Sequence, residues 1–459
     1  MSSAASDAGG SDEGRTADST PAATFRPFHV WLTILTGLAF MGNGLDLSVI
    51  SFSLPGMRAE LGLSAAQLGY ILPMNGLGQL VGAIAIGSLA DRIGRRLAFV
   101  LTGCLAGAGV GLGALTSDPV VFAALLFVTG TGIGGVAPAA SALLSELAPP
   151  RHRGQMMAWT QVFWVVGWSI AATLGAGFEA VLGWRGILAV GALPAILALV
   201  SWRVVPESPR YLMARGHHDR AHLLAQRLAE RHGVHIPIGV ASSLRARASV
   251  TSQLATIWGP SLWRRTFALW TTWGAMNAVF SGPIYMMPVL LEGLGVGNPL
   301  QLSAYVGYAM IPASLISVYA IDRSGRRPLM IGSLSLAGLG ALAVTLGTSP
   351  LAVVIGGAVL AGGALAAWPV ALAWASEQYP THLRGTAAGW AAGVSRLGSI
   401  SAPLVVGQLL VLGGGSQRLA MLPFTVALFA AIASVTIFAG ETANQTLEEL
   451  TQTGRPSGT

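Results

Sequence analysis

Twelve apolar stretches dominate this sequence, and each is close to or above the ~20 residues with which an α-helix crosses the hydrocarbon core of a bilayer. They are too long and too continuous for the strands of a membrane barrel, which would hold about 10 residues of alternating character. Only 10% of the residues are charged, whereas soluble domains hold about 25%. We therefore predict an all-α integral membrane protein with spans near 29–54, 66–89, 97–116, 119–145, 155–178, 185–203, 264–291, 299–321, 328–347, 350–375, 386–412 and 417–439.

The placement of the arginines predicts how the chain is oriented in the membrane. All 26 cationic side chains are arginine. With both termini in the cytoplasm, 22 arginines fall on cytoplasmic segments, three (Arg58, Arg185 and Arg418) fall outside, and Arg396 falls within a span. This asymmetry is the positive-inside pattern. The net charge of +7 therefore indicates a multi-pass protein of the cytoplasmic (inner) membrane in contact with lipid, and not a nucleic-acid binder.

The segments outside the spans divide the chain. Residues 1–28 are rich in Ser, Ala, Gly, Asp and Thr without periodicity, which predicts a disordered tail. The longest connection is predicted to form short amphipathic helices, with Leu223, Leu224 and Leu228 on one face. The predicted order is a cytoplasmic tail (1–28), an N-terminal six-helix half (29–203), a central cytoplasmic loop (204–263), a C-terminal six-helix half (264–439) and a cytoplasmic tail (440–459).

Four of the connecting loops repeat at one fixed offset of 231 residues. The loop G-S-L-A-D-R-I-G-R-R contains Asp91, and its counterpart Y-A-I-D-R-S-G-R-R contains Asp322. The loop S-E-L-A-P-P-R-H-R-G contains Glu146, and its counterpart S-E-Q-Y-P-T-H-L-R-G contains Glu377. Four loops that agree on one offset predict two six-helix halves in the same orientation, a parallel repeat.

Acids and arginines recur together in these loops, at the ends of predicted helices. We predict that they form a cytoplasmic gate whose ion pairs hold in one state of the protein and break in the other. The alternative is that the arginines serve topology alone and pair incidentally, although topology does not require the repeated acids. The predicted gate residues are Asp91, Arg92, Gly94, Arg95, Glu146, Arg153, Glu207, Arg210, Asp322, Arg326, Glu377 and Arg384.

Two charged residues lie well inside predicted spans. Asp46 is ~25 Å from the start of the first span, and Arg396 is ~15 Å into the eleventh. A charge inside a membrane is costly and is a functional hypothesis by default. Asp46 is the candidate carrier of a coupled proton, and Arg396 is a candidate clamp for a substrate carboxylate or a partner for Asp46. The alternatives are structural, with Asp46 bonded to neighbouring helices and Arg396 to backbone carbonyls.

The motifs resemble those of the major facilitator superfamily, whose most specific signature is the G-x-L-A-D-R-x-G-R-R loop. P-E-S-P-R-Y-L, from Pro206, and G-E-T-A-N-Q-T-L-E-E-L, after the last span, resemble its sugar-porter-like branches. D-L-S-V-I-S-F-S-L-P, from Asp46, and Q-V-F-W-V-V-G-W, from Gln161, are similar to metabolite:proton symporters, which include nicotinate and aromatic-acid carriers. The sequence departs from these carriers at Asn43, where aromatic-acid carriers typically have an acid, and at Gln161, where nicotinate-type relatives often have Glu.

The resemblance implies alternating access, in which the two halves rock around a site at the midplane. It implies a monomer that uses a proton gradient and no cofactor, with spans 1, 4, 7 and 10 around a central cavity. Aromatic walls with a few polar groups suit a flat organic ligand, although each Trp has the alternative of an interfacial belt or lipid contact. The predicted substrate-binding residues are Arg396, Asn277, Gln161, Trp164, Trp273, Tyr285 and Trp374.

The function that these features favour is proton-coupled import of a small organic acid, such as an aromatic carboxylate. One alternative is a proton-driven exporter of drugs or metabolites, but span 5 lacks the G-P-x-x-G-G element of many such antiporters. Another is a sugar porter, but the lone Arg396 favours an anion. An enzyme or a sensor is not expected, because the sequence has no Walker loop, Gly-x-Ser-x-Gly elbow or metal-ligand cluster. Its single cysteine, Cys104, excludes a disulfide within the chain.

Overall fold

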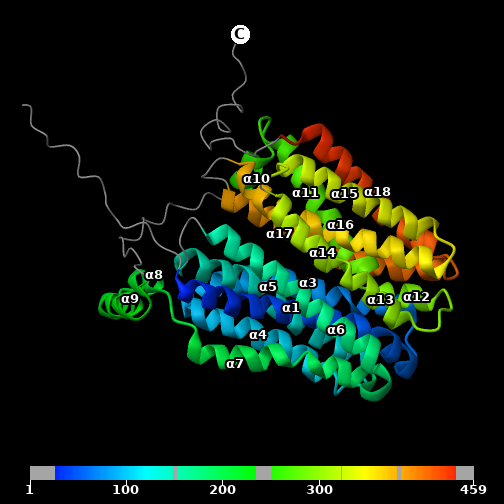
Figure 1. Cartoon of the computed structure of the whole chain (residues 1–459), viewed down its shortest axis with the longest axis horizontal. Helices are drawn as coiled ribbons and strands as arrows, with labels where there is room; N and C mark the ends of the chain where they lie inside the picture. The colour runs from blue at the N-terminus through cyan, green and yellow to red at the C-terminus, as the bar shows by residue number, and fades with distance from the viewer. Residues whose placement is uncertain (1–25, 148–151, 234–249, 322, 380–383, 441–459) are drawn as a thin grey trace, which may run out of the picture.

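The computed structural model describes residues 26–147, 152–233, 250–321, 323–379 and 384–440. Regular structure in these ranges is helical. Figure 1 shows two bundles of long helices packed side by side, one formed by the blue to green N-terminal helices and one by the yellow-green to red C-terminal helices. The described chain begins and finishes at the same end of the bundles, which we call the termini end. The other end is called the opposite end.

The described residues of the N-terminal half form seven helices. Pro73 begins α3 directly after α2, so that the two together make one span. In α6 two helices meet at a kink at Gly183, where φ is +61°, a left-handed conformation that favours glycine. The helices are α1 (Pro27–Leu61), α2 (Ala65–Ile71), α3 (Pro73–Ile93), α4 (Arg95–Gly113), α5 (Pro119–Leu147), α6 (Arg153–Val190) and α7 (Leu193–Val204).

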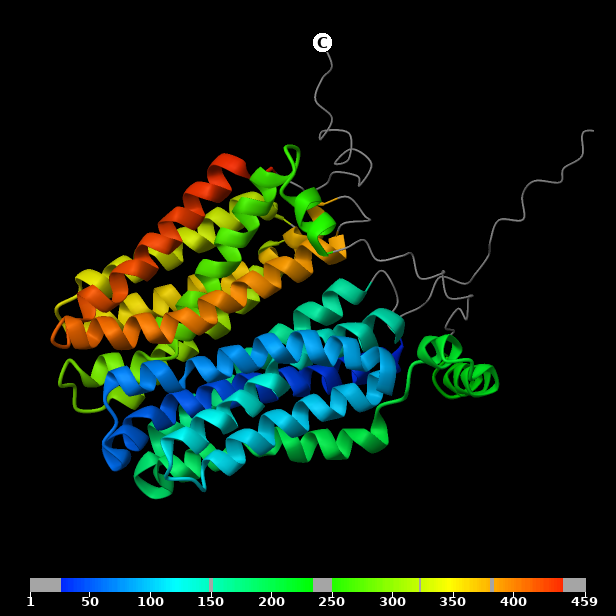
Figure 2. The same cartoon turned by 180° about the vertical axis from the view of Figure 1, so that it is seen from behind.

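Three short helices follow at the termini end: α8 (Pro209–Ala214), α9 (His218–His232) and α10 (Val250–Ile257). Figure 2 shows α8 and α9 beyond the ends of the N-terminal helices. The predicted amphipathic character of this segment is present in α9, where Leu228 is buried and Leu224 packs against the same cluster. The prediction for Leu223 is wrong: its side chain is 48% exposed, because it lies about 100° around the helix from Leu224.

The C-terminal half contains interrupted spans. Its first span runs through α11 and then the π-helical turn η1, which contains Pro283, before α12 completes it. Its second span is divided into α13 and α14. The elements are α11 (Trp263–Val279), η1 (Phe280–Ile284), α12 (Met287–Glu292), α13 (Pro299–Tyr308), α14 (Met310–Ala320), α15 (Arg326–Leu346), α16 (Pro350–Glu377), α17 (Arg384–Leu412) and α18 (Gln417–Phe438).

Nine helices of the described chain are long and apolar enough to cross a membrane. One of them, Gln155–Arg203, continues past the Gly183 kink and accounts for two of the predicted spans. The interrupted spans α11–η1–α12 and α13–α14 account for the others, so the twelve-span fold is confirmed. One boundary is wrong: α1 begins at Pro27 and not after residue 28, because proline is well suited to the first position of a helix.

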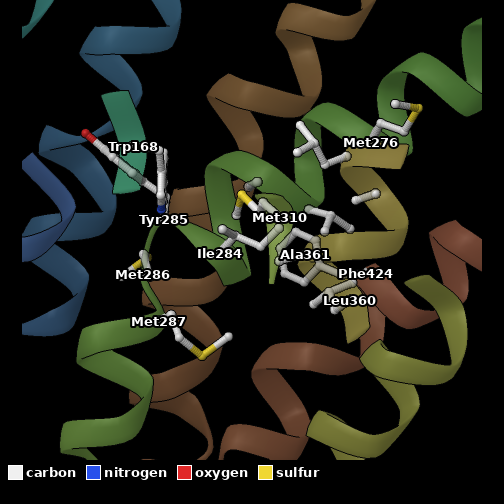
Figure 3. Close-up of a cluster of buried hydrophobic side chains, with 14 of the residues drawn as sticks. Trp168, Met276, Ile284, Tyr285, Met286, Met287, Met310, Leu360, Ala361 and Phe424 are labelled. Atoms are coloured by element: carbon white, nitrogen blue, oxygen red, sulfur yellow. The ribbon is translucent and has the colours of Figure 1, made fainter. Parts of the chain in front are cut away.

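Glycines allow the helices of each half to approach closely. A Cβ on Gly44 of α1 would lie 2.0 Å from the Trp164 carbonyl oxygen, and one on Gly167 of α6 would lie 1.9 Å from that of Met41. Small residues at such crossings permit backbone contact in membranes. The core of the C-terminal half is filled by side chains such as Met276, Met286, Met287 and Met310, drawn in Figure 3. The close crossings hold α1, and with it Asp46, in a fixed position against α6.

Candidate functional site

Asp46 is a buried acid with no hydrogen-bond partner among the described residues. It lies about 28 Å along α1 from Pro27, its side chain is 0% exposed, and neither carboxylate oxygen has a hydrogen-bond partner in the described part of the chain. Two hydroxyls of α1 bond elsewhere: Ser48 donates to the Trp168 carbonyl at 3.0 Å, and Ser51 donates to the Tyr285 carbonyl at 2.5 Å. An ionised carboxylate in this setting is strongly destabilised, so Asp46 is suited to holding a proton.

Tyr285 brings a second unpaired group to Asp46 from the other half of the protein. It directly follows η1, is 5% exposed, and its hydroxyl has no hydrogen-bond partner among the described residues. The Ser51 hydroxyl of α1 donates to the Tyr285 carbonyl, so Tyr285 lies against the helix that carries Asp46. Figure 3 shows the Tyr285 side chain extending from the C-terminal half toward Trp168 of α6. An unpaired acid and an unpaired hydroxyl thus lie on the two sides of the junction between the halves.

Arg396 joins the two halves through an amide. The Arg396 guanidinium of α17 donates to Oε1 of Gln79 on α3, and Nε2 of Gln79 donates to Oδ1 of Asn75 at 2.6 Å. Gln79 and Asn75 are 6% and 3% exposed, and Nδ2 of Asn75 has no partner in the described ranges. Arg396 and Asp46 therefore do not pair in this conformation.

Five aromatic rings form a continuous path between the halves. Trp168 stacks on Trp164 of the same helix, with ring centroids 5.5 Å apart. Trp164 contacts Phe280 of η1 edge-on, with ring centroids 6.0 Å apart. Phe280 contacts Trp368 of α16 edge-on, also with ring centroids 6.0 Å apart. Trp368 lies 5.8 Å from Trp273 of α11. Such a path offers flat apolar surface on both sides of the junction.

Two of the three tryptophans predicted to bind substrate are internal. Trp273 and Trp374 are 8% and 1% exposed, so they do not form an interfacial belt. Their indole N–H groups have no acceptor among the described residues. Indole N–H groups usually find a partner when buried, and these two are available as donors. Gln161 is half-buried on α6, three residues before Trp164 and therefore on the same helix face.

Asn277 does not remain free for a ligand. Its side-chain Nδ2 donates to the Trp273 carbonyl at 3.1 Å, and its Oδ1 accepts from the Ser399 hydroxyl of α17 at 3.2 Å. The side chain is 5% exposed. Asn277 therefore binds α11 to α17 in the structure, while its predicted contact with substrate stays a prediction.

Four of the predicted gate residues, Arg92, Gly94, Arg95 and Glu207, meet around the start of α4. Oε1 of Glu207 accepts from the backbone N–H of Arg95 at 2.9 Å, and it also accepts from the next N–H of the helix. A carboxylate at this position satisfies unpaired N–H groups and complements the helix dipole. Gly94 has φ +103°, and a Cβ there would lie 2.4 Å from Oε2 of Glu207. The Tyr211 hydroxyl donates to the Arg92 carbonyl at 3.0 Å, which holds α8 against this loop.

The rest of the predicted gate is only partly described. Arg326 donates to the Ile321 carbonyl at 3.1 Å within its own half. Residue Asp322 and the side chains of six others lie outside the described residues, so their pairing across the halves stays a prediction. These six are Asp91, Glu146, Arg153, Arg210, Glu377 and Arg384.

Sequence reasoning missed several contacts between the halves. At the opposite end, Arg58 of α1 forms an ion pair with Glu292 of α12 at 3.2 Å. The two residues lie far apart along the chain, and no sequence pattern indicated that they form an ion pair. Asn75 and Gln79 were also missed, although two amides four residues apart in an apolar span must share a helix face and could have been noticed.

Comparisons with known proteins agree with this architecture. The family model described as "Sugar (and other) transporter" matches residues 31–453. The chain belongs to this transporter family. It is therefore a secondary transporter of a small organic solute within the major facilitator superfamily, and not an enzyme.

The names of two relatives of this transporter refer to aromatic acids. It is 30% identical to the niacin transporter NiaP of Acinetobacter baylyi, over 92% of this chain and 96% of that protein. It is 30% identical to the gentisate transporter of Corynebacterium glutamicum, over 85% of this chain and 83% of that protein. Among solved structures, the inward-open xylose transporter XylE of E. coli superimposes with a TM-score of 0.73 at 20% identity, covering 93% of this chain and 99% of that one. That likeness shows the fold.

Proposed function

We propose that this transporter imports a small aromatic carboxylate together with a proton. The observation that carries the proposal is the pair of uncompensated groups at mid-span, a buried acid at Asp46 and a guanidinium at Arg396 whose described partner is a neutral amide. It acts as a monomer in the cytoplasmic membrane, with both termini and the gate loops on the cytoplasmic side.

Arg396 supplies the recognition of the anion. A guanidinium presents a planar fork that fits a carboxylate with two parallel hydrogen bonds. The neutral Gln79 amide leaves the charge of Arg396 uncompensated, so a carboxylate is the better ligand. The aromatic path from Trp164 to Trp273 supplies surface for a flat ring. The names of the niacin and gentisate relatives support an aromatic acid of this size.

Asp46 supplies the coupling. The neutral, protonated form avoids the cost of an unpaired charge in the membrane. We expect Asp46 to take a proton from the periplasmic side while Arg396 takes the anion, so that the loaded site is close to neutral. Rocking of the two halves then carries both to the other side, and loss of the proton to the cytoplasm favours release and return of the empty protein.

The test is uptake into proteoliposomes across an imposed pH gradient, with radiolabelled pyridine-3-carboxylate, 2,5-dihydroxybenzoate, xylose and a cationic drug as substrates. We expect gradient-dependent accumulation of at least one carboxylate. Asp46→Asn is expected to exchange carboxylate but not to concentrate it, and Arg396→Lys to lose most of its carboxylate affinity because it keeps the charge without the fork. Accumulation by Asp46→Asn would overturn the proton assignment, and accumulation of xylose alone would indicate a sugar porter.

A further inference from the structure

A buried hydrogen-bond network joins α3 to α17, and it has features of a ligand-binding site as well as of a contact between helices. Its members are Asn75, Gln79 and Arg396, and it lies near the middle of the α2–α3 and α17 spans. We propose that Gln79 is an internal ligand of Arg396, which occupies the guanidinium in the empty transporter and is displaced by the carboxylate of the substrate. This inference rests on the proposed function, since it concerns the same anion.

The first argument is the mismatch of charge. Within the described chain, Gln79 is the hydrogen-bond partner of the Arg396 side chain, and it is neutral. A carboxylate brings a negative charge and two acceptor oxygens that fit the guanidinium fork, whereas the Gln79 amide offers one neutral oxygen. An amide oxygen can therefore satisfy the guanidinium for a time and still give way to an anion. A carboxylate in the protein at this position would not give way.

The second argument is an unused donor beside the amide. Asn75 accepts from Gln79 through Oδ1, whereas its Nδ2 is buried and has no partner in the described ranges. Buried donors are rarely left unpaired. An anion between α3 and α17 that replaced the Gln79 oxygen on Arg396 would have the Asn75 N–H group nearby as a second donor.

The third argument is the rigidity of the support. A Cβ on Gly130 of α5 would lie 2.0 Å from the Asn75 carbonyl oxygen, and one on Gly134 would lie 2.1 Å from that of Gln79. The backbones that carry both amides are therefore held against α5. The proposed displacement therefore involves rotation of the Gln79 side chain while its backbone stays in place. The close packing that these glycines of α5 permit therefore positions the network.

The exchange also alters the contact between the halves. Arg396 belongs to the C-terminal half and Gln79 to the N-terminal half, so their hydrogen bond joins the two. Displacement of Gln79 replaces a direct bond between the halves with one that runs through the substrate. The free energy of substrate binding is then the difference between the free energies with which Arg396 binds the carboxylate and the Gln79 amide.

The test compares Gln79→Ala and Gln79→Glu with the matched control Gln408→Ala. Gln408 of α17 also bonds across the halves, to the Tyr70 hydroxyl at 2.6 Å, but does not contact Arg396. With pyridine-3-carboxylate or benzoate as the probe, we expect Gln79→Ala to bind about fivefold tighter, the effect of removing one competing hydrogen bond. Gln79→Glu is expected to bind at least about tenfold more weakly, because its carboxylate keeps Arg396. Gln408→Ala should leave the affinity unchanged.

A second readout separates this inference from the proposed function. Phenylglyoxal modifies free guanidinium groups, and mass spectrometry of the peptide that contains Arg396 reports its rate of reaction without any substrate. We expect faster modification of Arg396 in Gln79→Ala and slower modification in Gln79→Glu, each relative to wild type. Equal rates in all three proteins would overturn the internal-ligand role even if carboxylates are transported. Weaker carboxylate binding by Gln79→Ala would overturn it as well, because Gln79 would then be a direct ligand of the substrate.

Discussion

Asp46 and Asn277 occupy equivalent positions in the two halves, 231 residues apart, but their side chains differ in whether they are hydrogen-bonded. Both polar atoms of the Asn277 side chain are hydrogen-bonded, since Nδ2 donates to the Trp273 carbonyl and Oδ1 accepts from Ser399. Asp46 has no hydrogen bond within the described chain. Residue 168, the counterpart of Ser399, is a tryptophan that offers no hydroxyl to Asp46. The repeat has therefore diverged into a structural position in one half and an uncompensated acid in the other.

This contrast predicts separate defects for the two positions. Asn277→Ala should lower the free energy of unfolding by about 1–3 kcal/mol, because it leaves buried polar groups unpaired, and it should keep coupling to the pH gradient. Asp46→Asn should keep the melting temperature within a few degrees and lose coupling. Melting temperatures in detergent and gradient-driven uptake measure the two effects. Loss of coupling in Asn277→Ala at normal stability would contradict the assignment.

Much of the fold could be predicted, because its signals lie in short stretches of sequence. Continuous apolar runs indicate which segments span the membrane, and the positions of the arginines indicate their orientation. The interruption at η1 was not predicted, since Gly282 and Pro283 are tolerated within membrane helices and give no clear boundary. Asp46 and Arg396 could be singled out from the sequence because a charged residue is costly in a membrane, and their roles stay predictions. The hydrogen-bond partner of Arg396 could not be predicted, because the Gln79–Arg396 bond spans 317 residues and depends on how the halves pack.

The ion pair between Arg58 and Glu292 predicts that the equilibrium between open and closed states of the opposite end depends on the charges of these two residues. The two side chains are 34% and 41% exposed and connect α1 to α12 at the opposite end. An exposed pair contributes about 0.2–1 kcal/mol, so Arg58→Glu should shift the equilibrium a few-fold toward states in which this end is open. Distances between spin labels on the two halves report the shift. The double variant Arg58→Glu/Glu292→Arg should restore the wild-type distribution, and failure of the swap to restore it would remove the pair as a cause.

The Glu207 carboxylate predicts a stability effect confined to the termini end. Glu207→Ala removes the acceptor for two N–H groups at the start of α4 and should lower stability by about 0.5–2 kcal/mol, as other lost caps do. The matched control is Glu230→Ala on the exposed face of α9, whose side chain accepts from Gln226 of the same helix. Hydrogen exchange of the first turn of α4 should increase in Glu207→Ala and not in Glu230→Ala. Equal exchange in both would show that the cap contributes little.

The close crossing of α1 and α6 predicts opposite outcomes for two glycines of one helix. A methyl group at Gly167 would overlap the Met41 carbonyl, so Gly167→Ala must separate the helices and should cost at least about 1–3 kcal/mol. A methyl group at Gly177 would meet nothing within 4 Å. Gly177→Ala should therefore stabilise α6 by about 0.5–1 kcal/mol, since alanine favours the helix. Melting temperatures compare the two directly. Because Asp46 lies on the crossing helix, Gly167→Ala should also weaken proton-coupled uptake, whereas Gly177→Ala should leave it intact.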